Sequence, residues 1–353
     1  MTISRIKLYN FRSYDLYEAE FGEAGTVIVG PNGTGKTNLL EAVYVALRGG
    51  SFRGSLSDVM KHDADQTIIQ LDTSRGTRRV ELLKSADSKV NKEFIIDDNH
   101  MKLLPRKRRD SVVLFEPSEL RLITSSPSRR RDFLDGILSR LDGEYDRSLR
   151  AFNRTLLQRN ELLKRHDDDN SSWRDHLFAW DIKFVQLASS VAKARAHFLY
   201  THESEIGKLY SSLSGTSTSF GIDYQPSVSL DGYEQTLLDR LQRARDYETV
   251  TGHTSLGPHR EDFLIQLHNQ PAIKVASRGE MRTIMLAFKL LELDLQSQIS
   301  ENPPIILMDD VFSELDATRE KLLQETIQHH QFIITTTDTR HQKGGGVIIS
   351  TQA

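Results

Sequence analysis

Residues 30–37 form a glycine-rich loop that reads Gly30-Pro31-Asn32-Gly33-Thr34-Gly35-Lys36-Thr37. This loop matches the phosphate-binding pattern G-x-x-x-x-G-K-[ST] at every fixed position. The β-branched run at 26–29 predicts a buried strand before the loop, and residues 38–47 have the apolar spacing of a helix after it. The order of strand, glycine loop and helix therefore predicts an α/β domain that binds phosphate groups.

Each part of the loop has an expected role in binding a nucleoside triphosphate. The glycines let backbone N–H groups approach phosphate oxygens without a Cβ clash, and the N-terminus of the following helix adds partial positive charge. We expect Lys36 to reach the β- and γ-phosphates and the Thr37 hydroxyl to ligate Mg²⁺. ATP and Mg²⁺ are therefore the predicted ligands of residues Gly30, Pro31, Asn32, Gly33, Thr34, Gly35, Lys36 and Thr37.

The composition is typical of a soluble globular protein. The 353 residues include 38% hydrophobic and 27% charged side chains, and no apolar run approaches the roughly 20 residues that span a bilayer. The N-terminus lacks a secretory apolar segment, and the absence of cysteine excludes disulfides and cysteine-ligated zinc. We expect a cytoplasmic location and no membrane contact. With a net charge of −3, any DNA contact must come from a local basic patch or an assembled dimer.

The pattern of predicted elements changes within the chain. Short strands are expected at 3–11, 16–21, 67–72, 78–84 and 93–97, whereas residues 117–249 have helical spacing and many charges. Ser128 is the predicted N-cap of the first helix of this region. We therefore predict a nucleotide-binding head made of residues 1–116 and 250–353, with residues 117–249 inserted as a compact helical lobe.

A second segment carries the acidic groups that such chemistry requires. The apolar run at 305–308 predicts a strand beside the strand of the phosphate-binding loop, and it ends in Asp309 and Asp310. We expect Asp309 to hold Mg²⁺, largely through water, and Asp310 to orient or deprotonate the attacking water. Upstream, Ser277 and Gly279 begin a long amphipathic helix, and downstream a Ser-Glu-Leu-Asp turn ends at Asp316.

The order of these segments is typical of ATP-binding-cassette ATPases. A transporter cassette lacks so long a charged insertion, and a chromosome-maintenance ATPase inserts many hundreds of residues of coiled coil. The predicted fold is therefore a cassette-type, chromosome-maintenance-like P-loop ATPase head with an inserted compact helical lobe.

The sequence resembles the RecF family of bacterial recombination mediators over essentially the whole chain. The most specific matching runs are Ser126-Pro127-Ser128-Arg129-Arg130-Arg131-Asp132-Phe133-Leu134-Asp135, Gly257-Pro258-His259-Arg260 and Asp309-Asp310-Val311-Phe312-Ser313-Glu314-Leu315-Asp316. The resemblance implies a head-to-tail dimer that forms on ATP, clamps duplex or gapped DNA and hydrolyses ATP slowly, faster with DNA. It also implies action with RecR and, through it, RecO and RecA in repair at single-strand gaps, replication restart and the SOS response.

The same resemblance implies roles for several further residues. Ser277 and Gly279 would contact the γ-phosphate held by the partner subunit, Asp316 would lie at the dimer interface, and Arg12 would lie near the phosphates. Arg278 and Glu280 depart from the glutamines that the family usually has around the signature serine. A structural role is expected for His259 rather than a catalytic one.

Two basic clusters are the candidates for DNA contact. The denser one is Arg106, Lys107, Arg108 and Arg109, and the other includes Arg129 and Arg130. Such side chains suit phosphate contacts, although a solvated charged face is the alternative for both clusters. No aromatic stacking motif accompanies them, so DNA recognition by shape and backbone is expected.

Three alternative functions remain. A transporter ATPase subunit is disfavoured by the charged insertion and by Thr335-Thr336-Thr337-Asp338 where transporters carry a switch histidine. A nuclease would need a further acidic domain after Asp310. A non-hydrolysing, ATP-gated DNA scaffold would use the same nucleotide site, but the presence of Asp310 favours slow hydrolysis.

Overall fold

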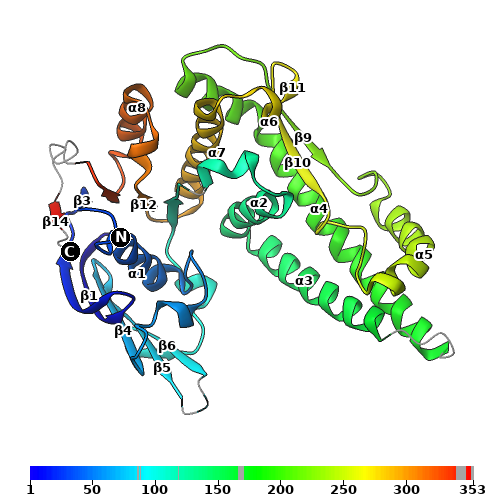
Figure 1. The fold of residues 1–353 in the computed structure, drawn as a ribbon, viewed down its shortest axis with the longest axis horizontal. Helices are drawn as coiled ribbons and strands as arrows, with labels where there is room; N and C mark the ends of the chain where they lie inside the picture. Colours follow the sequence, from blue (N-terminus) through cyan, green and yellow to red (C-terminus); the bar gives the residue numbers. More distant parts are fainter. Residues whose placement is uncertain (86, 88, 118, 166–170, 339–346, 351–353) are drawn as a thin grey trace. The chain divides into compact units, whose positions relative to one another are not determined.

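The computed structural model describes residues 1–350 except 86, 88, 118, 166–170 and 339–346. The chain forms two compact units, Met1–Ser118 with Glu292–Ala353 and Glu119–Leu291 (Figure 1). The first boundary lies close to the one predicted at 116. The second lies at 292 rather than 250, because β10 (Asp262–Leu267) pairs with β9 (Phe220–Gln225) and keeps the chain in the second unit.

The first unit contains a parallel sheet that carries the nucleotide-binding loop. Its strands occur in the order β14-β3-β13-β12-β8. Their bounds are Val347–Ser350, Gly25–Val29, Phe332–Thr336, Ile305–Asp309 and Val112–Phe115. The acidic strand β12 was expected beside the loop strand β3, and this is wrong: β13 pairs with both and lies between them. The exposed edge strand β14 was not predicted.

The second sheet of this unit is antiparallel, with the order β2-β1-β4-β5-β6-β7. Its strands are Tyr14–Glu20, Ile3–Phe11, Gln66–Thr73, Gly76–Lys84, Val90–Ile96 and Asn99–Met101. Helix α1 (Lys36–Arg48) shares one buried core with strands of both sheets, contributing Leu39, Leu40, Val43 and Leu47. The strands predicted from alternation and the helix after the loop are confirmed. Helix α8 (Ala317–Ile327) follows β12 in this unit.

The second unit is mainly helical. It contains α2 (Pro127–Leu141), α3 (Gly143–Lys164), α4 (Ser171–Ser214) and α5 (Tyr233–Thr251), with a small sheet in the order β11-β10-β9. Strand β11 is Gln270–Pro271, α6 is Ala272–Val275, and α7 (Arg278–Ile299) runs from this unit into the first. The N-cap of α2 is Ser126 rather than the predicted Ser128, because Pro127 suits the first helical position. Among the helices that the structure describes, none has the length and apolar composition needed to cross a membrane.

Two buried arginines, Arg130 and Arg195, join the two most specific sequence runs of the second unit. Arg130 Nε donates to Asp262 Oδ1 at 2.9 Å, and Arg195 donates to both oxygens of Asp135 at 2.8 Å. The other guanidinium nitrogen of Arg195 donates to the Pro258 carbonyl at 2.7 Å. These two sets of bonds hold α2 and α4 against residues 257–262, at the start of β10.

Candidate nucleotide-binding site

The glycine loop connects β3 to α1 in the conformation that its sequence requires. Gly33 and Gly35 have φ angles of 86° and 91°, which residues with a Cβ rarely adopt. Tyr14 Oη donates a hydrogen bond to the Gly35 carbonyl at 3.0 Å. A Cβ at Gly35 would lie only 2.7 Å from this Tyr14 hydroxyl oxygen. Because of both constraints, Gly35 is a position where only glycine fits without a shift of Tyr14.

Lys36 points back into the loop that precedes it. Its ammonium group donates to the carbonyls of Gly30 and Pro31, both at 2.8 Å, and its side chain is buried. The Lys36 ammonium group is therefore held by backbone carbonyls of the loop, close to the N-terminus of α1. The arrangement suits the β- and γ-phosphates of a nucleotide, as predicted from the motif.

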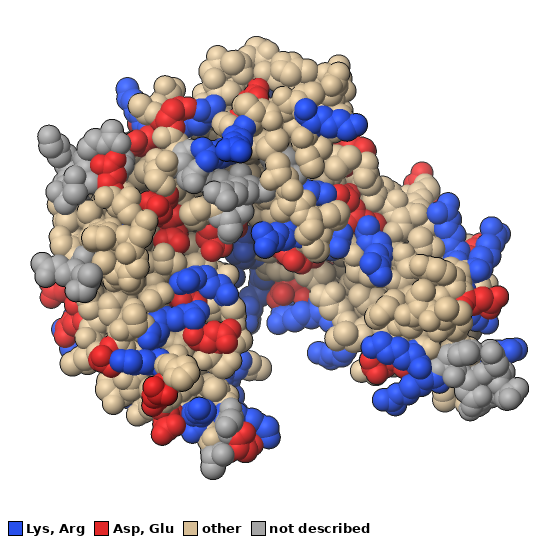
Figure 2. Space-filling model, viewed as in Figure 1, with Lys and Arg blue, Asp and Glu red and all other residues tan. Residues whose placement is uncertain are grey.

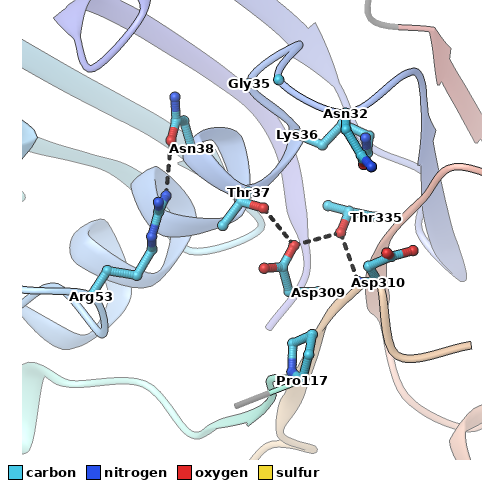
Figure 3. Close-up of a pocket in the computed structure, with 11 residues that line it drawn as sticks. Asn32, Gly35, Lys36, Thr37, Asn38, Arg53, Pro117, Asp309, Asp310 and Thr335 are labelled. Atoms are coloured by element: carbon cyan, nitrogen blue, oxygen red, sulfur yellow. Dashed lines mark hydrogen bonds between the residues drawn. The ribbon is translucent and has the colours of Figure 1, made fainter. Parts of the chain in front are cut away.

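The acidic residues at the end of β12 meet the loop in the same pocket (Figure 3). Asp309 Oδ1 accepts hydrogen bonds from the hydroxyls of Thr37 and Thr335, at 2.8 Å and 2.7 Å. Asp310 has a left-handed backbone with φ 48°, and within the described chain its buried Oδ1 has no hydrogen-bond partner. A carboxylate oxygen held without a partner in a polar pocket is suited to bind or deprotonate a water molecule.

The residues present fit a magnesium ion. Thr37 and Asp309 bring a hydroxyl and a carboxylate oxygen together, and these are the hard oxygen ligands that Mg²⁺ prefers. The described residues contain no cluster of three or more His, Cys, Asp or Glu able to hold a metal alone. A magnesium ion beside a nucleotide usually has one or two carboxylate ligands from the protein, with water and phosphate oxygens supplying the others. When bound, it would neutralise negative charge on the phosphates.

The pocket has a volume of about 370 Å³ and combines predicted and unpredicted residues. Its lining consists of Asn32, Gly33, Gly35, Lys36, Thr37, Asn38, Arg53, Pro117, Asp309, Asp310 and Thr335. The prediction missed Asn38, Arg53, Pro117 and Thr335 as site residues. Arg53 Nη1 donates to Asn38 Oδ1 at 3.0 Å, so these two unpredicted residues lie side by side at the pocket.

Arg12 does not line this pocket. Its guanidinium makes two hydrogen bonds to the carboxylate of Glu41 in α1, at 2.9 Å and 2.8 Å, and the Glu41 side chain is fully buried. The Ser51 hydroxyl donates to the same carboxylate at 2.6 Å. Arg12 therefore forms an ion pair that links α1 to the turn between β1 and β2. The arginine that lines the pocket is Arg53.

The residues expected to act across a dimer have local roles in the chain itself. Ser277 and Glu280 form a capping box at the start of α7: the Ser277 hydroxyl accepts from the Glu280 N–H, and the Glu280 carboxylate accepts from the Ser277 N–H. The unusual Glu280 is thus explained as a helix-capping residue, with Gly279 in the same first turn. Asp316 is the N-cap of α8 and accepts from the Arg319 N–H at 3.0 Å. Contacts of Ser277, Gly279 and Asp316 with a partner subunit remain predictions.

The structure separates the basic DNA-contact candidates into two groups. Arg106, Lys107 and Arg108 are exposed, and so is Arg129 at the start of α2. Arg109 is half-buried and its Nε donates to the Leu104 carbonyl at 3.1 Å, so it is not grouped with the exposed residues. Arg130 is buried against Asp262, and we remove it from the candidates because its guanidinium is already held within the protein. Figure 2 shows Lys and Arg side chains scattered among Asp and Glu on the face in view, which agrees with local rather than global positive charge.

His259 has a structural position in the second unit, as expected. Its Nε2 lies 3.0 Å from the Thr254 carbonyl and its ring packs near Phe152 and Phe184. Burial lowers the pKa of His259 from 6.5 to about 4, opposed only in part by the hydrogen bond to Thr254. The imidazole is therefore neutral at physiological pH, with Nε2–H as the donor.

This lowered pKa predicts acid sensitivity of the fold. Below pH 6.5 the unfolded chain protonates His259 while the folded chain does not, so stability falls as the pH drops from 6.5 towards 4. The slope attributable to this group approaches 1.4 kcal/mol per pH unit, or roughly 3 kcal/mol in all. Urea unfolding of wild type and His259→Gln between pH 4 and 7 measures it. The stability difference between the two should change by that amount; a constant difference would contradict the assignment.

The comparisons with known proteins agree with this geometry. Residues 2–352 match the family model described as the RecF/RecN/SMC N terminal domain. The DNA replication and repair protein RecF of Lachnoclostridium phytofermentans is 32% identical over 96% of this chain and 93% of the relative. The RecF protein of Chlorobium phaeobacteroides is 34% identical over 98% and 97%. The chain belongs to the RecF family.

Solved structures confirm the predicted fold of this family member. A structure described as the recombination mediator protein RecF-ATP in the RecFOR pathway superposes with a TM-score of 0.84 at 28% identity, over 98% of this chain and 94% of that one. An Smc head bound to a domain of ScpA matches with a TM-score of 0.53 at 16% identity, over 96% and 90%. The second match shows the fold alone. The chromosome-maintenance-like cassette ATPase head is thus confirmed.

Proposed function

We propose that this protein binds ATP with Mg²⁺, dimerises on ATP, and holds DNA during recombinational repair and replication restart at single-strand gaps. The observation that carries the proposal is the meeting of Lys36, Thr37, Asp309 and Asp310 in one pocket. The names of the relatives, which specify DNA replication and repair and an ATP-bound state, support both the ligand and the process.

Hydrolysis in this proposal depends on groups of the chain itself. Lys36 holds the phosphates against the loop and offsets the negative charge that develops during transfer. Asp310 orients the attacking water through its unpartnered carboxylate oxygen and accepts its proton. This oxygen favours slow hydrolysis over the non-hydrolysing scaffold, because a scaffold has no need of a buried carboxylate without a partner.

The partners follow from the family rather than from a surface of this chain. The phrase RecFOR pathway, used for the ATP-bound relative, supports RecO and RecR as partners, with RecA loaded as a result. Ser277, Gly279 and Asp316 are proposed to complete the nucleotide site of a second copy. The direct test is a hydrolysis assay with Mg²⁺ and ATP, with and without gapped duplex DNA. A DNA-stimulated rate supports the proposal; a rate that ignores DNA would remove the DNA clamp from it.

The exposed cluster of Arg106, Lys107 and Arg108 is proposed to contact DNA phosphates. Replacing all three with alanine should weaken DNA binding and lower the slope of log K against log salt by about 0.9 for each residue that contacts a phosphate. Titration of labelled gapped DNA at several salt concentrations measures this slope. A control that replaces Lys89, Lys208 and Lys321, all exposed, changes the net charge equally. Equal slopes in the two variants would assign the cluster to a solvated face.

A further inference from the structure

We propose that Thr335 is a positioning residue for ATP hydrolysis, whose single hydroxyl orients both Asp309 and Asp310. The inference rests on the proposed function, since it assigns Asp309 to Mg²⁺ and Asp310 to the attacking water. Thr335 lies at the end of β13, is fully buried and lines the nucleotide pocket (Figure 3). In this proposal its hydroxyl acts through the two aspartates that it contacts.

The Thr335 hydroxyl makes one hydrogen bond to each acidic residue. It donates to Asp309 Oδ1 at 2.7 Å and accepts from the Asp310 backbone N–H at 3.0 Å. The Met308 carbonyl is a competing acceptor at 3.5 Å, but the shorter bond to a charged oxygen is the stronger one. A hydroxyl can donate once and accept as well, so one side chain satisfies both neighbours.

The order of the strands explains why a residue at this position can contact both Asp309 and Asp310. β13 lies between the loop strand β3 and the acidic strand β12, and Thr335 is paired in register with Ile28 on one side and Asp309 on the other. The hydroxyl of Thr37, at the start of α1, and the hydroxyl of Thr335, on β13, therefore approach Asp309 from two different elements, and both donate to Oδ1. In the described chain Oδ2 accepts no hydrogen bond, which leaves it available to a metal ion.

The same residue holds Asp310 in its unusual backbone conformation. The Asp310 N–H is shared between the Thr335 carbonyl and the Thr335 hydroxyl, both at 3.0 Å. Asp310 has φ 48° and ψ 30°, a left-handed conformation that a residue other than glycine rarely adopts. Because that backbone directs the Asp310 side chain, loss of one of the two acceptors would loosen the aim of the carboxylate.

The choice of threonine at this position points to a polar role. Valine has nearly the same shape and suits a buried strand, whereas a buried hydroxyl is unfavourable unless it is hydrogen-bonded. Thr336 is an internal control because it is also buried, yet its hydroxyl accepts from the Asp338 N–H at 3.0 Å and bonds to neither carboxylate. The two adjacent threonines thus differ in the contacts that matter here.

The test compares Thr335→Val, Thr335→Ser and Thr336→Val with wild type, with thermal melting as the check on folding. Two quantities are measured: the single-turnover hydrolysis rate, and the ratio of the Kd values for a fluorescent ATP analogue with EDTA and with Mg²⁺. Thr335→Val should hydrolyse ATP about 10- to 100-fold more slowly and lose most of the tightening by Mg²⁺, while its Kd in EDTA stays near wild type. Thr335→Ser keeps the hydroxyl and should restore both quantities, and Thr336→Val should resemble wild type.

Two results would overturn the inference while leaving the proposed function standing. In one, Thr335→Val hydrolyses ATP and responds to Mg²⁺ like wild type. In the other, Thr335→Val and Thr336→Val lose activity to the same extent, which would indicate a general packing effect. A wild-type protein that does not bind ATP at all would instead overturn the proposed function, and this inference with it.

Discussion

Lys36→Ala is expected to raise the Kd for ATP by about 100-fold and to abolish ATP-dependent dimers. The Lys36 ammonium is buried in the loop and positioned by the carbonyls of Gly30 and Pro31. Charge-assisted hydrogen bonds are worth about 1.5–3 kcal/mol each, so losing the bonds to two phosphates costs roughly 3 kcal/mol or more. Each 1.4 kcal/mol corresponds to a factor of ten in Kd.

Equilibrium titration with a fluorescent ATP analogue measures the change. Lys102→Ala is the control, because it removes an exposed lysine from the same unit. ATP affinity within a few-fold of wild type in Lys36→Ala would show that the loop is not the phosphate site. ATP-dependent dimers in the same variant would place the nucleotide that drives dimerisation elsewhere.

Asp310→Asn is expected to keep ATP binding and lose hydrolysis, by about 10²–10⁴-fold, which is the usual contribution of a general base. Asparagine preserves the size of the side chain and can keep the backbone hydrogen bonds to Thr335, but it cannot accept the proton of water. The variant should therefore remain as an ATP-bound dimer on DNA for longer than wild type. The two measurements are single-turnover hydrolysis and the lifetime of the DNA complex.

Asp309→Asn provides the contrasting control for this experiment. Asp309 meets the Thr37 hydroxyl, so its loss should weaken nucleotide binding in the presence of Mg²⁺ and leave binding in EDTA near wild type. Asp310→Asn should leave both affinities unchanged. If Asp310→Asn hydrolyses ATP at the wild-type rate, the catalytic carboxylate lies elsewhere.

Local patterns in the sequence were sufficient to predict most elements of the fold. The run at 26–29 became the buried strand β3, the glycine loop adopted positive φ angles, and the apolar run at 305–308 became β12. Each of these depends on neighbours within a few residues. The pairing of strands does not, and so the insertion of β13 between β3 and β12 and the extension of the second unit to Leu291 were missed.

The same distinction applies to the site. Lys36, Thr37, Asp309 and Asp310 belong to motifs whose chemistry is legible in sequence, and the structure places all four in one pocket. Arg12 and Arg130 have the charge of phosphate ligands, but in the structure they pair with carboxylates distant in sequence, the buried Glu41 and the partly buried Asp262. Thr335 was not predicted as a site residue, because only the order of the strands brings its hydroxyl to Asp309 and Asp310.

The most direct test of the account is light scattering of the purified protein with Mg²⁺, first without ATP, then with ATP, then with gapped duplex DNA added. The account predicts a monomer that becomes a dimer only with ATP, and a dimer that retains the DNA. A mass that ATP does not change, with DNA bound equally in both conditions, would contradict the ATP-dependent clamp.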